Sequence, residues 1–228
     1  MDKQLNHKKL DTYLGLCTEV YELSKPEAPS DAYAFYHKYV KAAKGPILEP
    51  MCGTGCFLIP LLEEGFDIHG FDASKHMLNR LNEKAKVKML RPNVWSGFVQ
   101  DLARPENYNL IFIPSGSFCL ITDLHDAKTA LRKFYENLNE GGIFLVEADT
   151  LQSVPTEIEE LKVRIYEQDQ LLDMLKAAGF KHTRTLKLLI IKNNLMSEMS
   201  LWFMNAGSKT YTKFRSCFHI TTNLLSCL

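Results

Sequence analysis

From Gly45 onward, short runs of apolar residues alternate with longer segments in which apolar residues recur every three or four positions. The short runs are typical of buried strands, and the longer period is typical of amphipathic helices. The pattern predicts strands at 46–48, 68–71, 94–99, 110–113 and 143–146, and helices at 57–64, 76–86, 126–138 and 167–178. Because strands and helices alternate at this spacing, we expect βαβ units and a parallel sheet.

The first 44 residues carry only the helical pattern. Tyr13, Cys17 and Tyr21 recur at four-residue spacing, and two prolines within 25–31 then separate this helix from a second one. We therefore expect a helical lid at 1–44, followed by an α/β core at 45–187. The predicted architecture is a three-layer α/β/α fold with a mostly parallel sheet and an N-terminal helical lid.

The charge balance limits the kinds of partner. The 27 Lys and Arg residues equal the 27 Asp and Glu residues, whereas sequence-independent binding of nucleic acid requires clustered positive charge. The start of the chain is polar, and no apolar run reaches the roughly 20 residues that span a bilayer. Six cysteines without an export signal indicate reduced thiols. We expect a cytoplasmic protein with neither a nucleic-acid nor a membrane partner.

The most informative segment is ILEPMCGTG at 47–55. A short strand ends in the carboxylate of Glu49, and a turn containing Gly53 and Gly55 leads into an apolar helix. Glycines permit a sharp turn and close approach of a ligand. A dinucleotide fingerprint needs a third glycine three residues later, where Leu58 stands. Glu49 would also repel a pyrophosphate, so a ligand with an ammonium or sulfonium group and no phosphates fits better.

Two more acids stand at or just after the ends of predicted strands. Asp72 ends the second strand, near the spacing from Gly55 at which an acid binds ribose hydroxyls in nucleotide-binding folds, and Asp101 follows the third strand. With Glu49, these acids would line the crevice at the carboxyl ends of the strands, where open α/β sheets bind ligands. Any one of them alone could be an ordinary strand-end or capping residue, whereas the three together with Gly-x-Gly favour a binding site.

These motifs resemble those of the class I S-adenosylmethionine (SAM)-dependent methyltransferases over roughly residues 10–187. Residues 49–55 resemble the family's glycine-rich motif, and 70–74 resemble the segment with its ribose-binding acid. Residues 138–142 resemble its turn before the fifth strand. Met51 stands where the motif usually has its first glycine, and we interpret it as the mark of a subfamily.

The resemblance implies a Rossmann-like fold, SAM as cofactor and methyl transfer as the reaction. In that family arrangement, Glu49 would bind the amino end of the methionyl part, Asp72 would hold the ribose and Asp101 the adenine amino group. Met77 would pack on the adenine, and Pro114 would lie near the methyl group. The expected cofactor-binding residues are Tyr21, Glu49, Met51, Cys52, Gly53, Gly55, Asp72, Ala73, Met77, Asp101, Leu102 and Pro114.

The methyl acceptor is expected to be a small molecule. No Asn-Pro-Pro-Tyr-like tetrapeptide follows the fourth strand, where the sequence reads IPSGSF at 113–118. Methyl transfer from a sulfonium mainly requires alignment and exclusion of water, and a base only when the acceptor must lose a proton. No catalytic base is assigned. His69 is expected to be a satisfied core residue, and His125 a capping or solvent-facing residue, although it could reach a substrate.

No metal site is expected. Cys52 and Cys56 lack a second Cys or His pair at ligand spacing, so they are interpreted as small buried residues. Two other functions stay open at this point. One is a protein that binds the cofactor with impaired or no catalysis, and the other is a nucleotide-dependent oxidoreductase, against which Leu58 counts.

Two segments depart from the family pattern. Only 150–164 fills the place where relatives usually carry an insert that walls the acceptor pocket, so a more open pocket is expected. Residues 188–228 form an atypical C-terminal tail without the family's usual final strand. One hypothesis is a frameshift in the coding sequence near Lys187, and the alternative is a genuine divergent tail in which 201–204 form the last strand.

Overall fold

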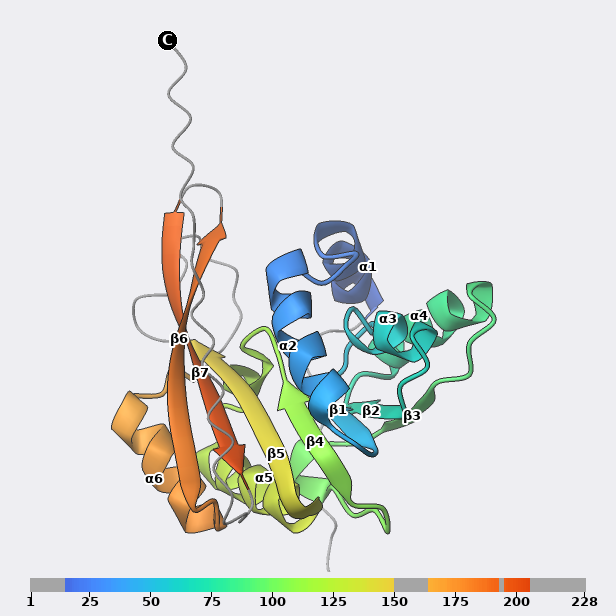
Figure 1. Ribbon diagram of the computed structural model, residues 1–228. Coiled ribbons are helices and arrows are strands. Elements are labelled where there is room, and N and C mark those ends of the chain that lie inside the picture. The colour runs from blue at the N-terminus through green and yellow to red at the C-terminus, as the bar shows by residue number, and fades with distance from the viewer. Residues whose placement is uncertain (1–14, 150–163, 193–194, 206–228) are drawn as a thin grey trace, which may run out of the picture.

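The computed structural model describes residues 15–149, 164–192 and 195–205, which build one seven-stranded sheet (Figure 1). The strand order is β3-β2-β1-β4-β5-β7-β6. Strands β1 to β5 pair in parallel, and β7 runs antiparallel to both β5 and β6. The strands are β1 (Ile47–Pro50), β2 (Ile68–Asp72), β3 (Asn93–Ser96), β4 (Tyr108–Ile113), β5 (Leu138–Asp149), β6 (His182–Lys192) and β7 (Leu195–Asn205).

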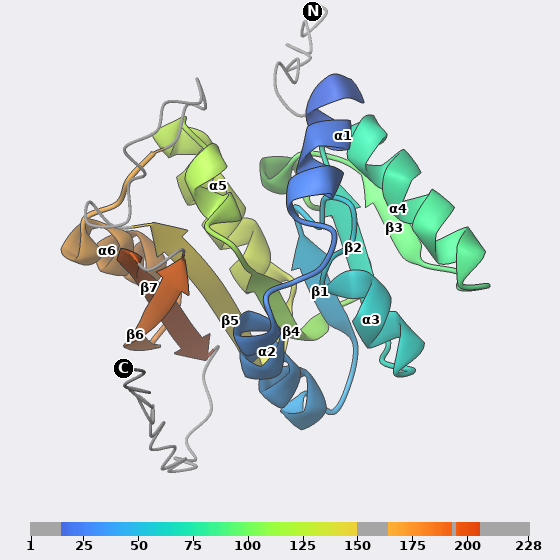
Figure 2. The same cartoon turned by 90° about the horizontal axis from the view of Figure 1, so that it is seen from above.

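Helices cover both faces of the sheet, as Figure 2 shows from above. Alternate strand residues point to opposite faces, so Ile47, Phe112 and Leu145 share a core with α2, α3 and α4. Their neighbours Leu48 and Ile111 share the other core with α5 and α6. The three-layer prediction is confirmed. The helices are α1 (Gly15–Ser24), α2 (Ser30–Ala42), α3 (Leu58–Glu63), α4 (Lys75–Val87), α5 (Leu124–Glu136) and α6 (Gln168–Ala178), with 3₁₀ turns η1 (Val99–Asp101) and η2 (Ser117–Leu120).

Local chemistry sets the helix ends. The side chain of Ser74 accepts the backbone N–H of Met77 and caps α4, and Asp123 caps α5 in the same way. Gly179 ends α6 in the left-handed conformation that only glycine adopts without strain. The two capped helices both start beside the carboxyl ends of strands, which is the edge of the sheet where the sequence predicts a site.

The observed bounds of two strands, β5 and β3, differ from the predicted bounds by more than two residues. Strand β5 begins at Leu138, because the residues of the expected turn form an irregular part of the strand. The register shifts there: Tyr108 pairs with Leu138, but Leu110 pairs with Ile143. Strand β3 ends at Ser96, and residues 99–101, whose apolar start suggested a longer strand, form a 3₁₀ turn.

The helices of the predicted lid lie within 15–42, and the expected boundary after residue 187 falls inside β6. Strand β7 contains residues 201–204, as the hypothesis of a genuine tail expects. The frameshift hypothesis concerns the gene and stays a prediction. The segment 150–163, on which the expected open pocket depends, lies outside the described residues.

In the part of the chain that the structure describes, no helix is long and apolar enough to cross a membrane. The cytoplasmic location stays a prediction.

Candidate functional site

The turn after β1 has an open side. Met51, Gly53 and Gly55 all have left-handed backbones, with φ of 58°, 53° and 81°. A Cβ at Gly55 would lie 2.9 Å from Cγ of Leu81, so glycine is needed there for packing against α4. A Cβ at Gly53 would meet no atom of the described residues within 4 Å. The backbone of Gly53 is therefore accessible to a ligand.

Glu49 is a buried acid beside this turn. Its side chain is 2% exposed, and its Oε2 has no hydrogen-bond partner among the described residues. Burial raises the pKa of Glu49 well above its usual value, the negative charge of Asp72 raises it further, and the backbone N–H of Leu58 opposes both. A nearby cation stabilises the charge of a buried carboxylate that has an oxygen without a hydrogen-bond partner, so this position suits a ligand with a positive charge.

Asp72, the last residue of β2, connects the turn to α4. Its Oδ2 accepts the backbone N–H of Gly53 at 2.9 Å, and its Oδ1 accepts that of Ser74 at 2.7 Å. Burial raises the pKa of Asp72, while these two N–H groups lower it. The structure thus brings Asp72 and Glu49 together, as expected for the ends of adjacent parallel strands.

The remaining predicted cofactor residues differ in their burial. Cys52 and Met77 are buried, and Ala73 is half-buried between Asp72 and the cap of α4. Asp101 is exposed in η1, five residues beyond the end of β3, whereas Leu102 is buried. The adenine-side role of Asp101 stays a prediction.

A second buried acid, Glu147, was not predicted from the sequence. Its Oε2 accepts the hydroxyl of Tyr36 and the backbone N–H of Ser115, both at 3.0 Å. The only available signal was an acid within the apolar run of β5. Burial raises the pKa of Tyr36, and the charges of Glu147 and Glu49 raise it further. Tyr36 therefore lies within electrostatic reach of both acids.

The segment after β4 has a constrained backbone. Pro114 is buried, and Ser115 and Gly116 follow it with left-handed φ of 60° and 66°. A left-handed backbone costs a residue other than glycine roughly 1–2 kcal/mol. Met51 and Ser115, two of the three such residues among those described, lie next to the acids, and backbone strain of this kind clusters at functional sites.

The helix α1, part of the predicted lid, is joined to the turn by polar and charged side chains. Nζ of Lys84 on α4 lies 2.8 Å from Oε1 of Glu22 and 3.5 Å from the hydroxyl of Thr54. Arg80 also contacts Glu22, at 3.3 Å. Tyr21, the predicted lid contact, is half-buried beside Glu22, with the ammonium of Lys25 5.5 Å from its ring centroid.

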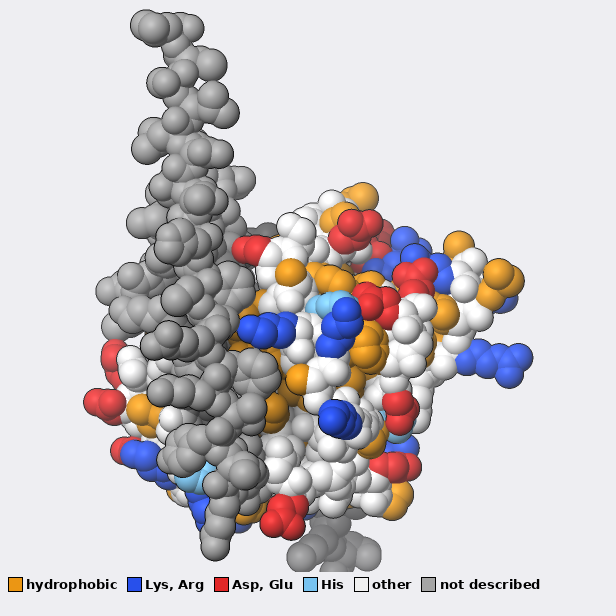
Figure 3. Space-filling model, in the orientation of Figure 1, with side chains coloured by type: hydrophobic (Ala, Val, Ile, Leu, Met, Phe, Trp, Pro, Cys, Tyr) orange, Lys and Arg blue, Asp and Glu red, His pale blue; other side chains and the backbone are white. Residues whose placement is uncertain are grey.

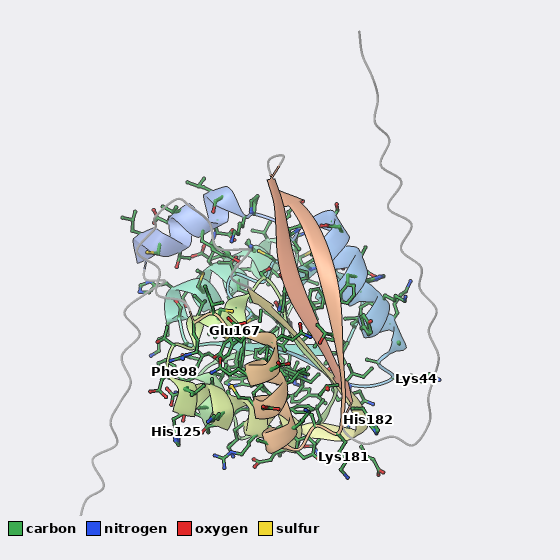
Figure 4. The ribbon with its side chains drawn as sticks, turned by 90° about the vertical axis from the view of Figure 1, so that its left-hand side faces the viewer. Lys44, Phe98, His125, Glu167, Lys181 and His182 are labelled. Atoms are coloured by element: carbon green, nitrogen blue, oxygen red, sulfur yellow. The ribbon has the colours of Figure 1, made fainter. Side chains whose placement is uncertain are left out.

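Both histidines singled out from the sequence lie where the simpler interpretation places them. Nδ1 of His69 is 3.2 Å from the hydroxyl of Tyr108, as for a satisfied core residue. His125 is exposed. Figure 4 shows His125 and Phe98 on one side of the molecule and Lys44 and His182 on the other. Phe98 follows the end of β3, whereas Lys44 precedes the start of β1.

The described part of the chain holds no group of three His, Cys, Asp or Glu side chains suited to a metal ion. On the described surface facing the viewer in Figure 3, Lys and Arg side chains alternate with Asp and Glu side chains. That face therefore presents a mixed field rather than one of a single sign.

Comparison with known proteins points to one family. The profile of a family described as "Methyltransferase domain" matches residues 47–142. A methyltransferase of Geobacillus sp. (strain WCH70) is 26% identical over 132 residues, which cover 56% of this chain and 53% of that protein. Glycine/sarcosine N-methyltransferase of Halorhodospira halochloris is 28% identical over 124 residues, which cover 53% and 46%. The chain thus spans about half the length of these curated relatives.

Among solved structures, an S-adenosylmethionine-dependent methyltransferase from Clostridium acetobutylicum ATCC 824 matches with a TM-score of 0.66 and 16% identity. The match covers 83% of this chain and 97% of that one. At this level of identity, the likeness concerns the fold.

Proposed function

We propose that this chain is a class I SAM-dependent methyltransferase, which transfers a methyl group from SAM to a small-molecule acceptor. The observation that best supports the proposal is the buried carboxylate of Glu49, with an unpaired oxygen, next to the open side of Gly53. SAM carries an ammonium group and a sulfonium group and has no phosphates, so its charge suits this position.

The residues around the turn fit the parts of such a ligand. Glu49 would hold the ammonium group, and the backbone at Gly53 would lie against the methionyl part. Asp72 already accepts two backbone N–H groups, and its oxygens retain lone pairs for ribose hydroxyls. Met77 would contact the adenine, and Asp101 would bind its amino group.

Bound SAM supplies a methyl group on a positively charged sulfur, so the leaving group needs no activation. The work left to the protein is alignment of the acceptor and exclusion of water. The rigid segment at Pro114 and Ser115 would form the acceptor side of the site, and α1 and α2 would cover it. No described side chain is assigned as a base, and none is needed for an acceptor that reacts as a neutral amine.

The acceptor is proposed to be a small molecule because the chain has no net charge and charges of both signs share the described face shown in Figure 3. Small primary and secondary amines are the first class to test, because one relative acts, by its name, on glycine and sarcosine. Neither nucleic acid nor a membrane is expected to be a partner.

A thermal-unfolding scan with SAM, S-adenosylhomocysteine (SAH) and NAD tests the cofactor. A ligand at about 100 times its dissociation constant stabilises the folded protein by roughly 2.7 kcal/mol. We expect stabilisation by SAM and SAH and none by NAD. A cooperative transition that none of the three ligands moves would contradict the proposal, and a shift with NAD alone would favour an oxidoreductase.

Activity is then measured as SAH formed from SAM with a panel of small amines. Formation of SAH together with a methylated amine establishes the reaction. Binding of SAM without turnover on any acceptor would instead indicate a protein that holds the cofactor without using it.

A further inference from the structure

Glu147 is a buried acid to which the proposed function assigns no role. It is 2% exposed and stands near the carboxyl end of β5, one residue beyond the pair formed by Ile113 and Val146. Because residues two apart share a face of a strand, Glu147 shares the face of Leu145, which packs toward α2. The same parity places Glu49 on this face, next to Ile47. Both buried acids therefore face the layer of α2.

Tyr36, on α2, interacts with both acids. Its ring packs 5.3 Å from that of Phe57 and 5.2 Å from that of Phe112, measured between centroids, so its position is fixed. Its hydroxyl donates to Glu147, and the charge of Glu49 also acts on it. The phenol of Tyr36 is thus hydrogen-bonded to Glu147 and lies within the electrostatic field of Glu49.

Glu147 also contacts the segment after β4. Its Oε2 accepts the N–H of Ser115, whose left-handed φ of 60° is unfavourable for serine. The carboxylate is therefore held at the strand-end segment by a hydrogen bond from the backbone. Under the proposed function, this segment is the one next to the transferred methyl group.

We propose that Glu147 is a specificity-determining residue of the cofactor site, which makes the protein prefer methyl-bearing SAM over SAH. This inference rests on the proposed function. In the methionyl part, only two methylenes separate the carbon that carries the ammonium group from the sulfur. An ammonium group held at Glu49 and a methyl group near Ser115 would therefore bring the sulfonium within electrostatic reach of Glu147, which contacts Ser115.

The charge of the ligand changes in the reaction. When the carbon–sulfur bond breaks, its electron pair stays on sulfur and the methyl carbon bonds to the acceptor, so the sulfonium becomes a neutral thioether. SAM and SAH carry the same ammonium and adenosine groups, so much of the contribution of Glu49 and Asp72 is common to both ligands. A buried carboxylate near the sulfur attracts only the cationic form. Glu147 would thus favour SAM binding and SAH release.

Calorimetric titration of SAM and of SAH into the full chain tests the inference, because the ratio of the two dissociation constants is independent of turnover. Glu147→Gln keeps the shape and removes the charge. The preference for SAM over SAH should then fall on the order of tenfold. Glu147→Asp withdraws the charge by one methylene and should give an intermediate ratio. Glu140→Gln, an exposed acid near the other end of β5, is the matched control and should leave the ratio unchanged.

Two results would overturn the inference. One is an equal loss of SAM and SAH affinity in Glu147→Gln, which would assign Glu147 a purely structural role at Ser115. The other, decisive if Glu147→Gln does not fold, is a wild-type ratio in Glu147→Asp. Failure of wild-type protein to bind either ligand is a separate result and would contradict the proposed function itself.

Discussion

The ammonium of Lys84 lies 2.8 Å from a carboxylate oxygen of Glu22 and 3.5 Å from the hydroxyl of Thr54. One cation therefore connects the N-terminal helix α1, the helix α4 and the glycine turn. The side chains of Glu22 and Lys84 are 11% and 20% exposed, so water screens this ion pair less than a surface pair.

A double-mutant cycle with Glu22→Gln and Lys84→Met should give a coupling energy of about 1 kcal/mol, measured by denaturant unfolding. The pair of Lys88 and Glu63 is the matched control. Its distance is similar, 2.7 Å, but its side chains are 46% and 39% exposed, so its coupling should be smaller. Equal coupling in the two cycles would show that burial of the pair of Glu22 and Lys84 has no energetic effect.

The same ion pair should weaken in acid. Burial would raise the pKa of Glu22, but hydrogen bonds from Lys84 and Thr54 outweigh it and hold the pKa below its usual 4.5. A carboxyl group with a lowered pKa in the folded state stabilises the fold above its unfolded pKa, and this contribution is lost as pH falls through the folded value. The coupling should therefore be constant near neutral pH and decline below about pH 4.5.

The open side of the glycine turn predicts how substitutions there affect ligand binding. Gly53 and Gly65 both have left-handed backbones, with φ of 53° and 85°, and a Cβ at either would contact no described atom within 4 Å. Each substitution to alanine should therefore cost a similar amount, roughly 1 kcal/mol of unfolding free energy. Only Gly53→Ala should abolish stabilisation by SAH, since its methyl group would occupy the ligand's place. Retained SAH binding in Gly53→Ala would remove the turn from the site.

Part of this site is predictable from the sequence and part is not. Glu49 and Asp72 end adjacent parallel strands, so their proximity follows from the βαβ pattern alone. The contact of Tyr36 with Glu147 joins residues 111 positions apart. It depends on β5 lying next to β4 and on α2 crossing that face, and no local pattern encodes either. The left-handed backbone of Met51 is also invisible in a pattern of apolar residues, although the family motif places a glycine there.

Removal of the buried charge at Glu49 should have opposite effects on stability and binding. Glu49→Gln eliminates a carboxylate that lacks a full set of partners, so the ligand-free protein should gain on the order of 1 kcal/mol of unfolding free energy at neutral pH. It should also lose the shift produced by SAM. Asp67→Asn, at an acid that is 69% exposed, serves as the control and should change neither by much. A Glu49→Gln protein that is less stable yet binds SAM normally would contradict the assigned role.

The raised pKa of Glu49 predicts how the stability of the ligand-free protein and its SAM affinity depend on pH. A carboxyl group with a higher pKa in the folded state than in the unfolded chain destabilises the fold as pH rises above the unfolded value, here 4.5. The raised pKa of Asp72 adds a contribution of the same sign. Ligand-free stability should therefore decrease from pH 4.5 toward neutrality, with a smaller decrease in Glu49→Gln. SAM affinity should increase over the same interval, because an ammonium group favours the ionised acid.

Removal of the Tyr36 hydroxyl tests the contact between α2 and β5. Tyr36→Phe removes the hydroxyl that donates to Oε2 of Glu147 beside the N–H of Ser115 and leaves a buried carboxylate less satisfied, so it should cost about 1–3 kcal/mol. Tyr33→Phe is the matched control on the same helix. Its hydroxyl also donates to a carboxylate, Glu64, at 2.7 Å, but this contact is exposed, so water can replace the lost donor and the cost should be below about 1 kcal/mol. Denaturant unfolding of both variants measures the difference, and equal costs would show that Glu147 does not depend on Tyr36.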